Sequence, residues 1–304
     1  MVYSFPGGLL LILLGLFVFN SDLTKDVEFQ KNMLRSSLFP QVSIASYPAL
    51  QSTVDLQSFG DMLSAEAAVV MDDDSKVNLF EKNAQKRFSM ASTTKIMTAL
   101  IALSYYKLDD VLTVDTGRVE GSVVGFKTGE KVTVENLLYG MLLPSGNDTA
   151  YVLAQNYPGG VEAFVLKMNE NAIHFHLTNT HFADPAGLAD GGDYTTAIDL
   201  ARLVSIALKN DTFSRIVATK LKTITDLNGN VYVVENLNKL LGIDGIDGVK
   251  TGFTDQARGI LTTSRFESGH RQIIIVMKSQ DRFLDTRKLL DMLRGNIIYQ
   301  SIRL

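Results

Sequence analysis

The chain shows three successive hydrophobic patterns. Residues 1–21 carry no charged side chain and are mostly apolar, whereas residues 22–60 are mixed and weakly periodic. Beyond them, short apolar runs and longer amphipathic segments alternate with turn residues, which predicts one folded domain over 61–296. Residues 297–304 are expected to form a short tail. The pattern therefore separates an apolar N-terminal segment and a stalk-like linker from a folded domain.

The N-terminal segment is typical of an export signal. Leu9–Phe19 is almost wholly aliphatic or aromatic and has the length of a signal-peptide apolar core, roughly 7–15 residues. The whole uncharged stretch, roughly 20 residues, is also long enough to cross a bilayer as a helix. No basic residue precedes the apolar run and no small-x-small cleavage site follows it, which favours an uncleaved anchor over a cleaved peptide. A buried N-terminal helix is the remaining alternative, and Pro6 with Gly7-Gly8 disfavours it.

Periodicity within the domain predicts an α+β fold. Strands or hairpins are expected over 67–71, 77–80, 219–225, 231–235, 248–252, 259–265 and 271–278, and helices over 92–106, 133–142, 148–156, 161–175, 196–208 and 281–293. Thr133 and Thr196 are expected to cap two of these helices. Strands and one buried helix come first, helices fill the middle, and strands with a helix come last. This order indicates an antiparallel sheet with an inserted helical lobe and not an alternating parallel fold.

Composition narrows the possible functions. The 304 residues include 29 Lys or Arg and 33 Asp or Glu, so a net charge of −4 offers no broad basic field for nucleic acid. Cysteine is absent, which excludes disulfides, thiolate catalysis and Cys-ligated metals. With 46% hydrophobic and 20% charged residues, the chain has the composition of a globular protein.

Ser92–Lys95 is the first candidate for chemistry. Residues three apart on a helix share a face, so Ser92 and Lys95 can touch. A serine hydroxyl is a weak nucleophile that needs a base, and lysine can serve once burial or a second cation lowers its pKa. Lys95 lies in an otherwise apolar segment, where a solvated lysine is not expected. The pair alone is a weak motif, but this setting favours catalysis.

Two later segments complete the candidate site. Ser145–Asn147 follows Pro144 between two helices, where Ser145 can relay a proton and Asn147 can bind an amide; a helix-capping turn explains the segment equally well. Lys250–Gly252 ends a strand, where Lys250 and Thr251 can hold a carboxylate. Gly252 there allows a substrate backbone to approach the strand edge.

Three other patterns are interpreted as structural. Lys127–Gly129 repeats the Lys-Thr-Gly triplet but lies in a polar stretch before Ser145, so we expect a turn. His174 and His176 point in different directions at a helix end, and no carboxylate completes a metal-binding motif. Asp72–Asp74 is expected to be a solvated turn, because the rest of a calcium loop is missing.

With these motifs in place, the chain resembles the serine-type D-Ala-D-Ala carboxypeptidases, the low-molecular-mass penicillin-binding proteins. Serine followed three residues later by lysine, a Ser-x-Asn triplet and Lys-Thr-Gly form the motif set of these enzymes and of serine β-lactamases. The resemblance covers about residues 62–295. It extends to the residues around each motif and to a middle helical signature, over the ranges 91–99, 142–148, 187–201 and 247–254.

The resemblance implies a fold and a set of roles. The fold would be a five-stranded antiparallel sheet flanked by helices, with the site between the sheet and the helical lobe, as in β-lactamases and DD-peptidases. Ser92 would be the acylated nucleophile and Lys95 its base, with Ser145, Asn147 and Lys250 completing proton transfer and substrate holding. Substrate would also be bound by Thr251, Gly252 and Phe253. The backbone N–H groups of Ser92 and Phe253 would form an oxyanion hole.

The expected function is removal of the terminal D-Ala from peptidoglycan stem peptides. The enzyme would work on the extracytoplasmic face of a bacterial membrane, tethered there by its N-terminal segment. It would need no cofactor or metal, bind no nucleic acid and be inhibited covalently by β-lactams. Relatives often have a small residue where Arg258 stands near the third motif, so details of substrate selection are expected to differ.

Three alternatives stay open. A DD-endopeptidase uses the same residues on cross-linked peptides. A serine β-lactamase is disfavoured, because the Glu-x-x-Leu-Asn loop of class A enzymes does not occur between Ser145 and Lys250. A non-catalytic wall-binding module is disfavoured because every polar residue of the mechanism is present.

Overall fold

The structure is a computed structural model that describes residues 47–51, 55–115, 117, 119–189 and 192–300. The predicted signal or anchor over 1–21 lies outside these residues, as does most of the predicted linker. None of the helices within the described ranges is long and apolar enough to cross a bilayer.

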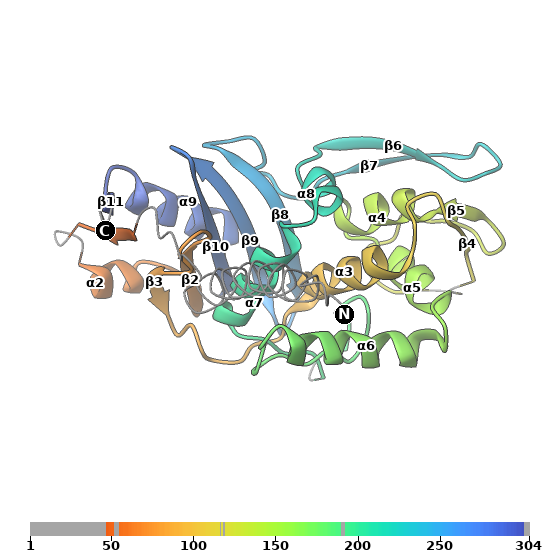
Figure 1. Ribbon diagram of the computed structural model, residues 1–304, viewed down its shortest axis with the longest axis horizontal. Coiled ribbons are helices and arrows are strands. Elements are labelled where there is room, and N and C mark those ends of the chain that lie inside the picture. The colour runs from red at the N-terminus through yellow and green to blue at the C-terminus, as the bar shows by residue number, and fades with distance from the viewer. Residues whose placement is uncertain (1–46, 52–54, 116, 118, 190–191, 301–304) are drawn as a thin grey trace, which may run out of the picture. The chain divides into compact units, whose positions relative to one another are not determined.

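A five-stranded antiparallel sheet forms the centre of the described residues (Figure 1). Its strand order is β3 (Asn78–Lys82), β2 (Ala67–Asp72), β10 (His270–Ser279), β9 (Arg258–Glu267) and β8 (Ile246–Thr254). The predicted α+β class and the five-stranded antiparallel sheet are confirmed. β8 lies at one edge and pairs with β9 only. That position leaves its other edge facing the helical lobe.

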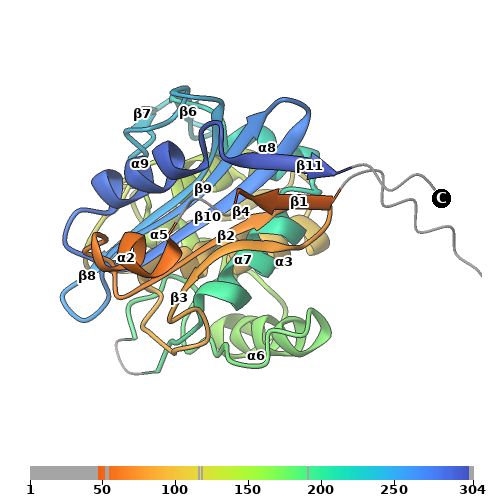
Figure 2. The ribbon, with the colours of Figure 1, turned by 90° about the vertical axis from the view of Figure 1, so that its left-hand side faces the viewer.

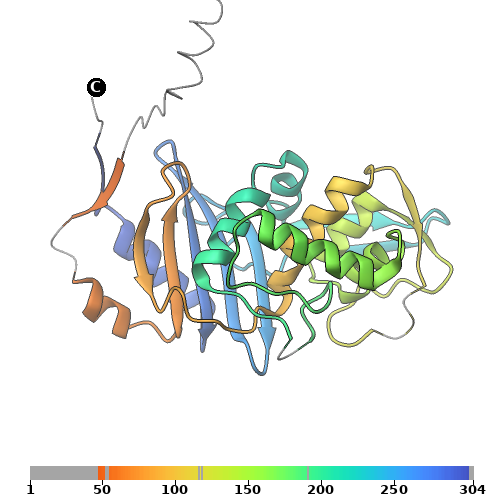
Figure 3. The same cartoon turned by 60° about the horizontal axis from the view of Figure 1, so that its bottom comes forward.

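Both faces of the sheet are buried. Alternate side chains of a strand point to opposite faces, and here each face has its own core. Along β2, Val69 belongs to the core beneath one face and Val70 to the core beneath the other. The first core contacts α7 (Ala197–Ala207), which crosses the sheet in Figure 3. The second core contains residues of α9 (Arg282–Leu293) on the opposite face (Figure 2). The result is a layer of helix on each side of the sheet.

The helical lobe lies beside the β8 edge of the sheet. Its elements are α3 (Lys95–Tyr105), α4 (Val134–Leu142), α5 (Asn147–Gln155), α6 (Gly160–His174) and α8 (Asp211–Val217), with the small two-stranded sheets β4 (Val111–Thr113) with β5 (Lys131–Thr133) and β6 (Leu221–Thr225) with β7 (Val231–Glu235). Both predicted caps are present: Thr133 accepts a hydrogen bond from the N–H of Asn136, and Thr196 from that of Asp199. The predicted 219–225 and 231–235 hairpin is confirmed as β6–β7.

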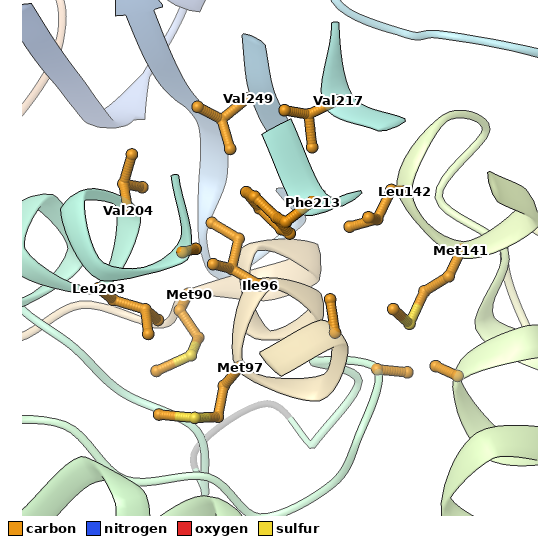
Figure 4. Close-up of a cluster of buried hydrophobic side chains, with 14 of the residues drawn as sticks. Met90, Ile96, Met97, Met141, Leu142, Leu203, Val204, Phe213, Val217 and Val249 are labelled. Atoms are coloured by element: carbon orange, nitrogen blue, oxygen red, sulfur yellow. The ribbon is translucent and has the colours of Figure 1, made fainter. Parts of the chain in front are cut away.

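One buried cluster joins the lobe to the sheet (Figure 4). Ile96 on α3 lies there among side chains from α4, α7, α8 and β8, including Phe213 and Val249. Protein interiors are close-packed, so such a cluster holds its elements at fixed separations. It therefore fixes the start of α3 relative to β8, the two segments that carry the first and third motifs.

Two regions differ from the sequence-based expectation. The predicted helix over 92–106 begins as a 3₁₀ turn, η1 (Ala91–Thr94), and becomes α-helical only at Lys95. The linker and tail boundaries also need correction. Within the predicted linker, β1 (Tyr47–Leu50) and α2 (Leu56–Asp61) are regular elements. β1 pairs antiparallel with β11 (Ile297–Gln300), which falls in the predicted tail. Weak periodicity hid these short elements.

Candidate active site

Ser92 and Lys95 meet at the junction of η1 and α3. The Lys95 Nζ lies 3.0 Å from the Ser92 Oγ, as the i, i+3 spacing predicts. Two glycines let neighbouring chain segments approach this turn. A Cβ on Gly187, whose φ is +81°, would lie 1.9 Å from the carbonyl oxygen of Ala91, and a Cβ on Gly252 would lie 3.3 Å from the Cβ of Ala91. The turn is therefore held between the 184–189 loop and β8.

Lys95 has three oxygen neighbours and no access to solvent. Besides Ser92, its Nζ donates to the Oδ1 of Asn147 at 2.7 Å and to the carbonyl oxygen of Ala186 at 2.7 Å. A neutral amine has two N–H donors and one lone pair. With both donors directed at Asn147 and Ala186, the lone pair is left for the hydroxyl proton of Ser92. This geometry is that of a general base beside its nucleophile.

The electrostatic environment favours that neutral form. Burial lowers the pKa of Lys95 to about 7, against the opposing effect of the nearby Asp184, Asp148 and Asp193 carboxylates. No ion pair found among the described residues involves Lys95 or Lys250. A large fraction of Lys95 is therefore unprotonated at neutral pH and able to accept a proton.

Ser145 and Asn147 come from the loop that leads into α5. Ser145 has a left-handed φ of +68° and is buried, and its Oγ has no hydrogen-bond partner within the described residues. Gly146 occupies the N-cap position without a side-chain cap, so the capping alternative for Asn147 is wrong. The Asn147 amide instead bridges Lys95 and the carbonyl oxygen of Glu120, to which its Nδ2 donates at 2.7 Å. Asn147 thus ties the start of α5 to the nucleophile helix α3.

Lys250–Phe253 runs along the edge strand β8. Lys250 is fully buried, and its Nζ donates to the carbonyl oxygen of Thr251 at 3.1 Å. Burial, then the charges of Lys95 and Arg282, lower the pKa of Lys250 well below its ordinary value. Phe253 is 59% exposed, so β8 passes from buried to solvent-facing at this point. The Lys95 charge acts on Lys250, which places the first and third motifs in one electrostatic site.

Arg282 is a site residue that the sequence patterns did not single out. Its guanidinium donates to the carbonyl oxygen of Gly252 at 2.7 Å and is half-buried. Arg282 is the first residue of α9, and no motif marks it because only the fold brings its side chain to β8. Its charge acts on the nearby Lys250, and its bond to Gly252 fixes the backbone of the Lys-Thr-Gly segment.

Asp184 was missed for the same reason. Its two carboxylate oxygens accept hydrogen bonds from four successive backbone N–H groups, those of residues 186–189, at 2.5–2.8 Å. This cradle fixes the carbonyl of Ala186, which is one of the acceptors of Lys95. Gly187 belongs to the middle helical signature, so the sequence could point to this segment. It could not show the role of the Asp184 carboxylate.

The segments interpreted as structural lie outside this cluster. Lys127–Gly129 forms a turn, in which the N–H of Glu130 donates to the carbonyl of Lys127. The ring of His174 contacts Phe175, and the ring of His181 stacks on Tyr194. Across the described ranges, no group of three or more His, Cys, Asp or Glu side chains is placed to hold a metal ion.

Comparison with known proteins identifies close relatives. Residues 53–281 match the D-alanyl-D-alanine carboxypeptidase family, peptidase S11. The D-alanyl-D-alanine carboxypeptidase DacF of Bacillus subtilis is 32% identical over 75% of this chain and 61% of its own length. The D-alanyl-D-alanine carboxypeptidase of Streptomyces sp. K15 is 36% identical over 71% of this chain and 81% of its own. The chain thus spans less than two thirds of the DacF length.

Two further comparisons bear on fold and reaction. The crystal structure of the Streptomyces K15 DD-transpeptidase superimposes with a TM-score of 0.73 at 34% identity, over 77% of this chain and 98% of that one. The D-alanyl-D-alanine endopeptidase of Pseudomonas aeruginosa is 32% identical over 73% of this chain and 72% of its own. The fold is therefore shared with enzymes named for three related reactions.

Proposed function

Because the chain belongs to the D-alanyl-D-alanine carboxypeptidase family of serine peptidases, we propose that it hydrolyses the D-Ala-D-Ala bond of peptidoglycan stem peptides through an acyl-enzyme on Ser92. The observation that carries this proposal is the buried Lys95 amine, 3.0 Å from the Ser92 hydroxyl and with a pKa of about 7. It supplies a base at neutral pH without histidine.

Acylation follows from the positions of these groups. Lys95 takes the hydroxyl proton as the Ser92 Oγ attacks the carbonyl carbon of the penultimate D-Ala. The N–H groups of Ser92 and Phe253 stabilise the resulting oxyanion, and one such donor is typically worth ~3–4 kcal/mol. The proton taken by Lys95 is relayed through the Ser145 hydroxyl, whose Oγ has no other partner in the described residues, to the departing amine of the terminal D-Ala, which leaves Lys95 neutral again. An ester on Ser92 and free D-Ala result.

Deacylation returns the enzyme to its starting state. A water molecule gives a proton to Lys95 and attacks the ester carbonyl, and the Ser92 oxygen leaves with a proton from the same amine. The tripeptide-D-Ala product then carries the new carboxylate. Both half-reactions use the same base, which agrees with a single lysine at the nucleophile.

Substrate binding is assigned to the edge strand β8. The Arg282 guanidinium, the N–H donors of Lys250 and the Thr251 hydroxyl favour the terminal carboxylate of the substrate. The substrate backbone adds to the edge of β8 as a further strand. Arg282 acts as a positioning residue through the Gly252 carbonyl.

Three further assignments accompany this proposal. A β-lactam presents a strained amide to Ser92 and is expected to acylate it. Peptidoglycan lies outside the cytoplasmic membrane, so the enzyme would act on the extracytoplasmic face. The apolar segment 1–21 would tether it to the membrane there.

The proposal is tested with the full-length protein in detergent and its Ser92→Ala variant. Each is incubated with an acetylated Lys-D-Ala-D-Ala peptide, free D-Ala is measured, and a penicilloyl adduct is sought by intact mass. D-Ala release and a long-lived adduct, both dependent on Ser92, are expected. Rapid penicillin turnover without adduct would instead indicate a β-lactamase.

The endopeptidase reaction is the second candidate, because a 32% identical relative carries that name. The cross-linked bond is also an amide of D-Ala, and the same site would cleave it. Purified cross-linked muropeptides, supplied in parallel with pentapeptides, measure the ratio of the two activities. A non-catalytic binder would retain muropeptide binding and release nothing from either substrate.

A further inference from the structure

A cationic pocket lies where β8 turns into β9, beside the site described above. Its volume is about 350 Å³. The lining includes three basic side chains, two aromatic rings and an amide: Lys86, Arg87, Lys278, Phe88, Tyr194 and Gln256. None of these residues takes part in the proposed acyl transfer.

Two of the cations share one carboxylate. The ammonium groups of Lys86 and Lys278 lie 5.2 Å and 5.7 Å from the centroid of the Phe88 ring. Both reach Glu66, at 3.7 Å and 3.0 Å from its carboxylate oxygens. Two positive charges against one negative charge leave this side of the pocket with a net charge of about +1.

The third cation has neutral partners. The guanidinium of Arg87 donates to the Oδ1 of Asn179 at 2.9 Å and 3.2 Å and stacks over the Tyr194 ring at 4.7 Å. Asp193 is the acid that also lines the pocket. Burial, then the charge of Asp184, raises the pKa of Asp193 to about 7, so this carboxyl offsets only part of the positive charge at neutral pH. The pocket as a whole is positive.

The direction of the substrate leads into this pocket. In the proposed complex the terminal carboxylate lies at Lys250 and Thr251, and the reacting carbonyl faces the N–H of Phe253. The upstream part of the peptide must then continue past Phe253 towards the β8–β9 turn. Gln256 in that turn lines the pocket. The pocket therefore lies on the N-terminal side of the reacting residue of the substrate.

The distance is also suitable. Ser89 lines the pocket three residues before Ser92, so the two Cα atoms are at most about 11 Å apart. The residue before the acylated D-Ala lies about 3.8 Å upstream, and a long extended side chain adds roughly 6 Å. The side chain of that residue is therefore long enough to reach from the reacting residue to the pocket.

We propose that this pocket binds a carboxylate on the side chain of the third stem-peptide residue and so selects a carboxylated diamino acid there over lysine. The inference rests on the proposed function and defines the substrate class of the same site. Charged pairs at a solvent-accessible site steer and select a partner even where each adds little affinity.

The test compares two peptides that differ by one charge. Both are L-Ala-γ-D-Glu-X-D-Ala-D-Ala, where X is diaminopimelate with its side-chain carboxylate either free or amidated. For the full-length protein in detergent, kcat/KM for the free acid is expected to exceed that for the amide about fivefold or more. The ratio should fall towards one in Arg87→Gln and Lys86→Gln. It should be kept in Lys167→Gln, which removes an exposed lysine on α6.

A ratio is used because partial misfolding lowers both activities equally. Equal kcat/KM values for the two peptides in the unaltered protein would overturn the proposal, as would a ratio that Arg87→Gln leaves intact. If neither peptide loses D-Ala, the proposed reaction fails, but the pocket is still tested. Titration calorimetry of the two peptides with Ser92→Ala would then show the fivefold preference or its absence.

Discussion

Lysines serve two different purposes in two neighbouring regions of this protein. In the catalytic region Lys95 and Lys250 are fully buried, and both have lowered pKa values. In the pocket at the β8–β9 turn Lys86 and Lys278 are 60% and 36% exposed and paired with Glu66. Burial penalises the charged form of an amine, whereas water and a carboxylate preserve it. The same side chain is thus a base in one region and a fixed charge in the other.

Among the predicted effects, the largest loss of activity is expected from Lys95→Met, which removes the buried lysine of the catalytic region. Removing the base should lower kcat/KM for D-Ala release by ~10²–10⁴-fold, the contribution typical of a positioned general base. The rate of acylation by penicillin, measured by stopped-flow mass spectrometry, should fall to a similar extent. Lys107→Met, which removes an exposed lysine two residues beyond α3, serves as the control and should stay fully active. Retained acylation in Lys95→Met would assign the base to another group.

The pH profile is expected to show the next largest effect. Because only the neutral amine accepts a proton, the acylation rate should rise as the pH increases towards 7 and then level off. Between pH 5 and 7 the rise should be roughly 50- to 100-fold for a single group. Rates measured with a β-lactam whose charge is constant over this range check the prediction. A flat profile would contradict the assignment of Lys95.

The Asp184→Asn variant sharpens the same point. The Asp184 carboxylate is the largest of the effects that oppose the lowering of the Lys95 pKa, so its loss should move the acid limb of the profile below pH 7. The asparagine keeps one acceptor oxygen but weakens the four-fold backbone cradle. Thermal unfolding of the variant, recorded beside the rate profile, separates this electrostatic shift from loss of structure. A limb moving upward would contradict the prediction.

The lowered pKa also has a consequence for stability. Between pH 7 and about 10 the unfolded chain holds a proton on Lys95 that the folded chain has released, so the free energy of unfolding should rise with pH. Relative to Lys95→Met, the gain between pH 7 and 9 is expected to be about 2 kcal/mol. Urea unfolding of both proteins at the two pH values measures it. A pH-independent difference would show that Lys95 titrates at the same pH in both states.

The smallest effect is expected in the exposed pocket. Lys278→Gln removes a solvent-accessible ion pair with Glu66 and should change the free energy of unfolding by less than ~1 kcal/mol. Urea denaturation at two salt concentrations checks this value, since screening should shrink it further. A large loss would mean that Lys278 supports the fold and is not available to a ligand.

The residue types of the site were easier to predict than the contacts between its segments. Ser92, Lys95, Ser145, Asn147 and Lys250 stand in short motifs whose residue types fit acyl transfer, and local spacing already brings Ser92 to Lys95. Contacts between motifs depend on the fold. The bond from Lys95 to Asn147 joins the start of α3 to the start of α5 across 52 residues of sequence, and no local pattern encodes it. For Arg282 the same limit applies, since its role depends on a side-chain bond from the start of α9 to Gly252 of β8, 30 residues away in the sequence.

The limits on predicting the fold have a similar origin. Long periodic segments, such as α6 and the hairpin β6–β7, were found because many side chains repeat one pattern. β1 and β11 have four residues each and lie far apart in the sequence. Their pairing is visible only when both ends of the domain are known. The 3₁₀ turn at η1 was missed because the backbone conformation of Ala91, with a φ of +44°, depends on the segments packed around it.

The pairing of β1 with β11 brings the two ends of the domain together. Tyr47 is the register partner of Gln300, so the chain enters and leaves this fold at a single place (Figure 2). A tether fused before one or after the other would hold the catalytic serine at nearly the same reach from its attachment point. The two ends could equally be joined by a short loop and new ends opened at the Asn228-Gly229 turn of the β6–β7 hairpin. In engineering terms, the domain can be spliced into another protein or circularly permuted while its catalytic residues keep their arrangement.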